Sequence, residues 1–145
     1  MSSRFFTADE QRQIVSAIES AEANCSGEIR VHIDRRCPGN VLDAAADVFA
    51  SLGMQKTALR NGVLFYVAVD DRKFAVIGDC GINSKVPDGF WNDVKAVVTA
   101  EFSAGRYVDG LTKGIILCGE QLKAYFPHSE DDIDELPNEI TYGNK

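Results

Sequence analysis

The hydrophobic and polar positions of the chain change their period several times, and each change predicts a different element. Apolar residues recur at helical spacing after residue 7, at Ile14, Ala17, Ile18 and Ala21. The segment 7–10 just before them has the S/T-x-x-E form of a capping box, so the pattern predicts a first helix over about residues 8–24. Residues 28–34 then alternate with period two, which predicts a strand with one buried and one solvated face.

An unbroken apolar run over residues 63–69 predicts the central strand of a sheet. β-branched and aromatic residues dominate this run, as expected of a strand that is covered on both faces. Asp70 and Asp71 then supply turn chemistry, and residues 73–77 read as a second short strand. We therefore expect these two strands to pair as an antiparallel hairpin.

Three more segments carry helical stripes. Residues 41–52 form a stripe that closes at Gly53, and this helix lies between the strand at 28–34 and the central strand. The three elements predict a βαβ unit with parallel strands and a right-handed crossover. Residues 90–102 and 107–126 predict two further helices with core-facing stripes, and Gly110 and Gly114 in the second should permit close packing on a neighbour.

Charge divides the chain into a body and a tail. The net charge of −7 is uneven, because residues 128–145 hold six acids and one base. We expect a folded domain over residues 1–127 and an acidic, mobile tail over residues 128–145, which has low apolar content. The body holds 16 acids and 14 bases without a clustered Lys/Arg surface, which disfavours binding of nucleic acid.

Composition also bears on location and on thiol chemistry. No segment has a signal-peptide core or the roughly 18 apolar residues of a membrane span, so we expect no membrane segment and a cytoplasmic location. The four cysteines have no CxxC spacing, which predicts reduced, inert thiols. His32 lies on the polar face of its strand and is expected to be a solvated histidine.

Three polar, glycine-containing loops should meet at one end of this sheet. They open the strand at 28, open the central strand and leave the antiparallel strand. The residues gathered there are Glu28, Arg60, Asn61, Gly78, Asp79, Gly81 and Asn83. Carboxylate and amide oxygens are ligands for Ca²⁺ or Mg²⁺, so Asp79 and Asn83 are candidate metal ligands, and Asp79 is also the candidate catalytic residue. The other five are candidate ligand-binding residues.

A purely structural interpretation of the same loops competes with the functional one. In it the glycines turn the chain and Asn61 holds a turn through its side chain. Asp79 then either pairs with Arg60 or caps the segment that follows it. Known catalytic signatures do not decide the matter, because the chain has no Walker loop, GxGxxG, GxSxG or HExxH motif. Any hydrolysis here would have to be metal-assisted.

Four motifs in order resemble the TPM domain family. They are NGVL at 61–64, DRK at 71–73, the glycine-flanked loop 78–81 and a G-x-Y-x-x-G-L block at 105–111, and the resemblance extends from about Phe6 to Phe126. The family includes a thylakoid lumen protein, a photosystem II repair factor and a modulator of acetylcholine receptors. The resemblance implies an α/β three-layer sandwich: a small, mixed and mostly parallel sheet with one antiparallel hairpin and helices on both faces.

The resemblance also implies a choice of functions. Family members have been linked to divalent-cation binding and to acid phosphatase activity, while others are accessory or assembly factors. Many members carry Asp before the Asn-Gly pair, where this chain has Arg60.

Our leading hypothesis is a TPM-type accessory or binding domain that assists a membrane-associated or assembly process. It would hold a protein partner or a small ligand at the end that contains Glu28, Arg60, Asn61 and Asp79. One alternative is a divalent-metal-dependent acid phosphatase in which Asp79 and Asn83 bind the metal and Arg60 steers phosphate. Another is an interaction module that acts through the acidic tail.

Overall fold

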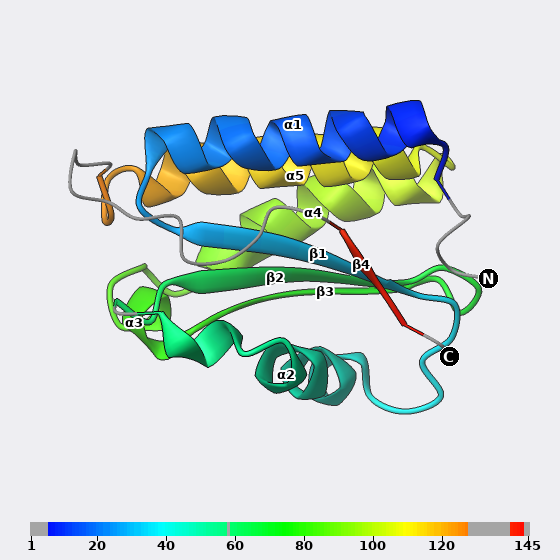
Figure 1. Ribbon diagram of the computed structural model, residues 1–145, viewed down its shortest axis with the longest axis horizontal. Helices are drawn as coiled ribbons and strands as arrows, with labels where there is room; N and C mark the ends of the chain where they lie inside the picture. The colour runs from blue at the N-terminus through cyan, green and yellow to red at the C-terminus, as the bar shows by residue number, and fades with distance from the viewer. Residues whose placement is uncertain (1–5, 58, 128–139, 144–145) are drawn as a thin grey trace.

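Helices cover both faces of a single four-stranded sheet in the computed structural model, which describes residues 6–57, 59–127 and 140–143 (Figure 1). The strands are β1 (Glu28–Asp34), β2 (Gly62–Ala68), β3 (Lys73–Gly78) and β4 (Thr141–Tyr142). The helices are α1 (Ala8–Asn24), α2 (Val41–Ser51), the 3₁₀ turn η2 (Met54–Lys56), α3 (Cys80–Asn83), α4 (Phe90–Ser103) and α5 (Tyr107–Leu122). None of the helices in these ranges is long and apolar enough to cross a membrane.

The strand order is β3-β2-β1-β4, and it confirms the predicted α/β fold. β1 and β2 run parallel, with Glu28 beside Gly62 and Asp34 beside Ala68, as the predicted βαβ unit requires. β3 returns antiparallel to β2, which confirms the hairpin. β4 adds to the free edge of β1 and runs parallel to it.

Two hydrophobic cores lie on opposite faces of the sheet. α1, α4 and α5 pack on one face and α2 on the other (Figure 1). Along β2, Phe65 and its odd-numbered neighbours belong to the first core, while Leu64 and Tyr66 belong to the second. Burying one such large side chain contributes about 1.5–3 kcal/mol, and a strand buried on both faces needs apolar residues at every position. This accounts for the unbroken apolar run.

Local sequence signals set the helix starts and the closest packing. Thr7 Oγ1 accepts a hydrogen bond from the amide of Glu10 at 3.1 Å, and Glu10 Oε1 accepts one from the amide of Thr7 at 2.9 Å, so the capping box is present. Close packing at Gly110 and Gly114 is also confirmed. A Cβ atom would lie 2.8 Å from the Phe102 ring at Gly110 and 2.4 Å from a Val98 methyl group at Gly114.

The polar face of β1 is buried, so the prediction of a solvated face with a solvated His32 was wrong. All seven residues of β1 are buried, and His32 is 8% exposed. Its Nδ1 lies 2.7 Å from Thr141 Oγ1 and its Nε2 lies 3.0 Å from Asp34 Oδ1. The Tyr66 hydroxyl donates to Asp34 Oδ2 at 2.6 Å. Polar groups can be buried here because they bond to one another.

The C-terminal residues fall into two groups. Residues 128–139 and 144–145 of the predicted acidic tail lie outside the described residues. Residues 140–143 lie beside β1, where Thr141 and Tyr142 form β4 and the Gly143 amide donates to the Ile33 carbonyl at 2.9 Å. The residue pattern of this segment does not predict a strand.

Candidate functional site

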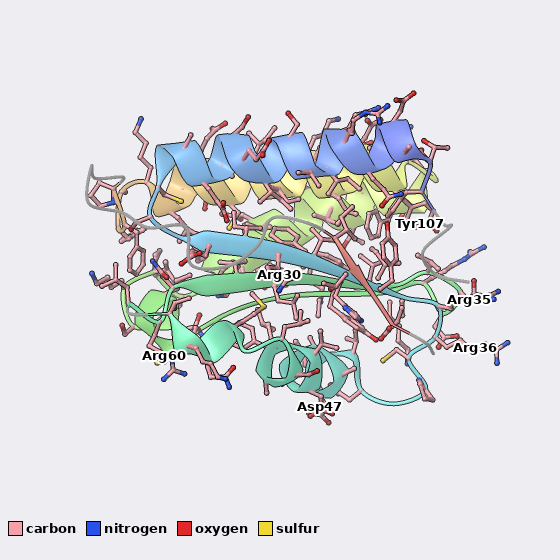
Figure 2. All side chains as sticks on the ribbon, viewed as in Figure 1. Arg30, Arg35, Arg36, Asp47, Arg60 and Tyr107 are labelled. Atoms are coloured by element: carbon pink, nitrogen blue, oxygen red, sulfur yellow. The ribbon has the colours of Figure 1, made fainter. Side chains whose placement is uncertain are left out.

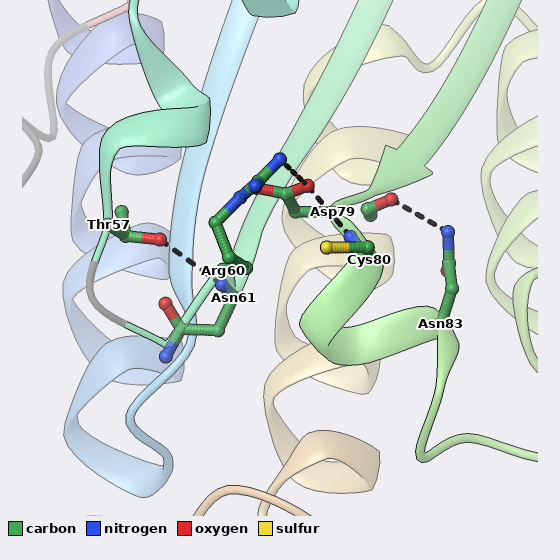
Figure 3. A network of polar contacts seen from close by, with 7 residues as sticks. Thr57, Arg60, Asn61, Asp79, Cys80 and Asn83 are labelled. Carbon is green, nitrogen blue, oxygen red and sulfur yellow. Dashed lines mark hydrogen bonds and ion pairs between the residues drawn. The ribbon is translucent and has the colours of Figure 1, made fainter.

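The three polar loops meet at one end of the sheet, as the topology predicted (Figure 3). The Glu28 amide donates to the Asn61 carbonyl at 3.1 Å, which joins the start of β1 to the start of β2. The Gly81 amide donates to the Arg60 carbonyl at 3.0 Å, which joins α3 to the same loop. Backbone hydrogen bonds therefore hold the candidate residues in one place.

Arg60 and Asp79 form a bidentate ion pair at the centre of this end. Arg60 Nε lies 2.7 Å from Asp79 Oδ2, and Nη2 lies 2.9 Å from Oδ1. This geometry matches the planar guanidinium to the planar carboxylate and gives the strong form of a charged hydrogen bond. The Arg60 backbone has a φ of 50°, in the left-handed region that non-glycine residues rarely adopt.

Asp79 also caps α3. Its Oδ1 atom accepts a hydrogen bond from the Cys80 amide at 2.7 Å, so Asp79 is the N-cap residue. Burial would raise the pKa of Asp79, but the hydrogen bonds from Arg60 and from Cys80, together with the charge of Arg60, outweigh burial and lower this pKa. The hydrogen bond to Asp79 in turn raises the pKa of Arg60. The pair is therefore fully ionised at neutral pH.

Asn61 and Glu28 are brought to this end but are buried beneath its surface. Asn61 is 2% exposed and Glu28 is 4% exposed. Asn61 Nδ2 donates to the Ser26 carbonyl at 2.7 Å, and the Asn61 side chain points away from the ion pair (Figure 3). Asn61 Oδ1 is buried without a hydrogen-bond partner in the described part of the chain. The Asn61 side chain thus bonds to backbone, as the structural interpretation expected, but it joins two loops instead of holding a turn.

Asn83 and the glycines have structural contacts of the same kind. Asn83 Nδ2 donates to the Gly78 carbonyl at 2.9 Å, and Asn83 Oδ1 accepts from Trp91 Nε1 at 2.9 Å. A Cβ atom at Gly78 would lie 2.4 Å from the Trp91 ring, and one at Gly81 would lie 2.1 Å from the Leu59 carbonyl. Trp91 is a site residue that the sequence analysis assigned only to a helix stripe.

The donor groups do not fit a divalent cation in this arrangement. Ca²⁺ takes roughly six to eight oxygen ligands, and Mg²⁺ takes about six in octahedral geometry. Both Asp79 oxygens accept from Arg60, the Asn83 oxygen accepts from Trp91, and the guanidinium brings positive charge to the place where a cation would bind. Across residues 6–57, 59–127 and 140–143, no group of three or more His, Cys, Asp or Glu side chains could hold a metal ion.

The thiols differ in accessibility. Cys25, Cys37 and Cys118 are buried and Cys80 is exposed, with no disulfide among the four. Burial raises the pKa of Cys118 far above its usual range, so this thiol stays protonated. Cys80 is the one thiol at the candidate site, where it follows Asp79 at the start of α3.

The TPM domain model matches residues 2–121. Among solved structures, the chain is similar to the NMR structure of the BA42 protein from the psychrophilic bacterium Bizionia argentinensis, with 48% identity, a TM-score of 0.92 and 97% of each chain covered. Two NMR structures of N-terminal domains share the fold. One is from a P. gingivalis protein, with 16% identity, a TM-score of 0.71, and 88% of this chain and 84% of that chain covered.

The other domain is from the cg2496 protein of Corynebacterium glutamicum, with 10% identity, a TM-score of 0.66, and 97% of this chain and 83% of that chain covered. A comparison with curated proteins gave no match. The family model spans most of the chain. The protein therefore belongs to the TPM domain family.

Proposed function

We propose that this TPM domain is a non-catalytic binding domain that holds an acidic segment of a partner protein at the Arg60–Asp79 end of the sheet. The bidentate ion pair is the observation that supports this function. A carboxylate whose two oxygens both accept hydrogen bonds from a guanidinium is a poor metal ligand and a poor nucleophile. The Arg60 guanidinium therefore occupies the position beside Asp79 where a metal cation would bind.

The surface around the pair suits a partner of that chemistry. The Arg60 side chain is 47% exposed, whereas the Asp79 side chain is 7% exposed, so Asp79 fixes the guanidinium from below and leaves its outer edge to solvent. Leu59, 55% exposed, lies next to it in the chain. A fixed cation beside an exposed apolar side chain favours a segment with a carboxylate and an apolar residue.

Calcium titration by calorimetry, with a phosphatase assay beside it, tests the non-catalytic part. We expect no binding heat with millimolar Ca²⁺ and no metal-dependent hydrolysis of p-nitrophenyl phosphate by the unmodified protein. Arg60→Asp should gain calcium binding, because it removes the cation that occupies Asp79 and adds a second carboxylate. Arg36→Asp makes the same charge change at an exposed residue at the other end of the molecule (Figure 2) and should not.

Metal-dependent turnover by the unmodified protein that is lost in Asp79→Asn would favour the acid phosphatase instead. The binding part has its own test, because Cys80 can carry a photoactivatable crosslinker beside the proposed surface. A crosslinked partner should be captured by the unmodified protein and by Arg36→Ala but not by Arg60→Ala. Equal capture by Arg60→Ala would contradict the proposal. Replacing the tail acids Glu130, Asp131, Asp132, Asp134, Glu135 and Glu139 with Asn or Gln tests whether the acidic tail contributes, and it keeps residues 140–143.

A further inference from the structure

A cavity of about 600 Å³ lies at the hairpin end of the sheet, opposite to the Arg60–Asp79 site. Its walls come from the β2–β3 turn, from α4, and from the starts of α2 and α5. Tyr107, Arg35 and Arg36 lie toward this end of the molecule, and Arg60 lies toward the other (Figure 2). The volume is within the range of pockets that bind small molecules.

The charged residues that line the cavity are all basic, although the chain carries a net charge of −7. They are Arg72, Lys73 and Lys95, and no acidic side chain of residues 6–57, 59–127 or 140–143 lines it. Three cations in one concave site focus a positive potential. The cavity therefore favours an anion.

The acids nearest to the cavity in the chain are engaged elsewhere. Asp70 Oδ2 lies 3.2 Å from Arg35 Nε, and Asp71 Oδ2 accepts from the Cys37 amide at 2.7 Å. Glu101 of α4 is paired with Arg106 and Lys113. The hairpin acids are thus engaged by the loop after β1, while Arg72 and Lys73 line the cavity.

The Lys73 ammonium group is held in place by backbone carbonyls. Lys73 Nζ donates to the Cys37 carbonyl at 2.7 Å and to the Gly39 carbonyl at 2.8 Å. Arg72 has a φ of 55°, a conformation that glycine adopts without strain and arginine does not. Backbone strain of this kind gathers at functional sites.

α4 supplies two hydroxyl groups in line with its cation. Lys95, Thr99 and Ser103 all line the cavity, and their spacing of four residues places them on one face of the helix. Hydroxyl donors beside cations are suited to the oxygen atoms of a phosphate group.

Besides Val41 and Gly105, the rest of the wall is aromatic. The rings of Phe74 and Phe102 meet edge to face with centroids 5.5 Å apart, and those of Phe102 and Tyr107 lie 4.9 Å apart. All three residues line the cavity. A joined aromatic surface beside three cations favours a ligand with a planar ring and a negative charge.

We propose that this cavity binds a phosphate ester carried on a planar ring, with a nucleoside monophosphate as its simplest representative. Arg72, Lys73 and Lys95 hold the phosphate group, with Thr99 and Ser103 as further donors. The ring packs on Phe102 and Tyr107. This site goes beyond the partner-binding surface proposed above and does not depend on it.

Calorimetry with adenosine monophosphate, adenosine and inorganic phosphate tests both halves of the ligand. We expect adenosine monophosphate to bind, and adenosine and phosphate each to bind at least tenfold more weakly, since each lacks one half of the contacts. Adenosine binding as tightly as the monophosphate would overturn the role of the cations. Phosphate binding as tightly would overturn the role of the rings, and no heat with millimolar adenosine monophosphate would overturn the whole proposal.

Three variants locate the site. Lys95→Ala and Arg72→Gly should each weaken binding of adenosine monophosphate about tenfold, while Lys123→Ala, an exposed lysine outside the cavity, should not. Arg72→Gly also relieves the backbone at this turn, so it should bind less tightly while melting at the same temperature or higher. A loss of affinity that comes only with a lower melting temperature would overturn the role of Arg72.

NMR separates this proposal from the one for the Arg60–Asp79 end. Adenosine monophosphate should shift amide signals of residues 72–74 and 95–107 in the ¹⁵N-labelled protein, and Arg60→Ala should leave the affinity unchanged. Shifts confined to the Arg60 loop, or affinity lost in Arg60→Ala, would overturn the assignment to this cavity.

Discussion

Arg60 and Arg72 are the non-glycine residues with positive φ in the described part of the chain, and they lie at opposite ends of the sheet. Either backbone position would suit glycine better. Arg60 instead pairs its guanidinium with Asp79, and Arg72 lines the cavity. The two ends of the sheet therefore differ in chemistry, because the arginine is paired with a carboxylate at one end and lines a cavity at the other.

The ion pair at Asp79 predicts a dependence of stability on pH. Because folding lowers the pKa of Asp79, the ionised form stabilises the fold at every pH above the ordinary aspartate value of about 3.9. This contribution is lost as pH falls through the lowered folded pKa. Asp79→Asn should therefore be less stable than the unmodified protein at pH 7, and the difference should shrink toward pH 3 in urea denaturation.

A second substitution separates the charge of Asp79 from its capping role. Asparagine keeps one side-chain oxygen that can cap α3, so Asp79→Asn removes the charge and the second acceptor for Arg60 but keeps the cap. Asp79→Ala also removes the cap of α3 and should cost about 1 kcal/mol more. Parallel pH curves for the unmodified protein and Asp79→Asn would contradict the assignment of the ion pair.

At the scale of elements, the pattern of apolar and polar residues predicted the structure wherever the whole signal lies within one segment. The capping box, the apolar run of β2 and the hairpin are local patterns, and these elements form as predicted. The burial of the polar face of β1 is not local. It depends on Tyr66 from β2 and on Thr141, which lies 109 residues from His32 in the chain. An alternation with period two indicates that one face of a strand is polar, but it does not indicate which residues cover that face.

The candidate site was predictable to the same extent. Topology brought the three loops together, but it left open whether Asp79 pairs with Arg60 or caps α3, and Asp79 does both. The ion pair involves an arginine whose backbone is left-handed, a conformation that no residue pattern predicts. The cavity at the hairpin end escaped prediction because Lys95 is 22 positions from Lys73 and joins it only through packing of α4.

The contact of β4 with β1 gives a prediction at Gly143. A Cβ atom there would lie 1.6 Å from Asp34 Oδ1, so Gly143→Ala should detach residues 140–143 from β1. We expect a loss of about 1–3 kcal/mol in the free energy of unfolding, as for other forced contacts. Faster amide hydrogen exchange along β1, measured by NMR, should accompany this loss.

Gly39→Ala is the matched control for this substitution, because nothing lies within 4 Å of the Cβ position at Gly39. It should leave both stability and exchange unchanged. If Gly143→Ala kept the exchange rates of the unmodified protein, the position of β4 beside Asp34 would be refuted.

At the scale of the whole molecule, the helical layer depends on the close approach of its first and last helices. α1 and α5 lie side by side over the sheet (Figure 1). A Cβ atom at Gly119 would lie 2.6 Å from Ala21 Cβ and 2.8 Å from Ala21 Cα, so α5 cannot carry a larger residue there without moving away from α1. This contact sets the spacing between the two helices.

Gly119→Ala should therefore lower the melting temperature, even though alanine favours a helix more than glycine does. The expected cost of overpacking is about 1–3 kcal/mol, or roughly 2–12 °C for a chain of this size. Ala21→Gly in the same chain returns the space, so the double variant should lose less stability than the sum of the two single variants. Additive losses, measured by thermal denaturation, would show that the two residues do not touch.

The position of β4 has a consequence for how the chain folds during synthesis. The N-terminal part of a chain leaves the ribosome first, and domains begin to fold from that end. β1 and β2 can pair once residue 68 has emerged, but His32 and Asp34 gain their neighbours Thr141 and Gly143 only after more than half of the chain has followed. In a nascent chain, the polar side chains of β1 would thus still be exposed to water, and β4 would cover the edge of β1 late in synthesis.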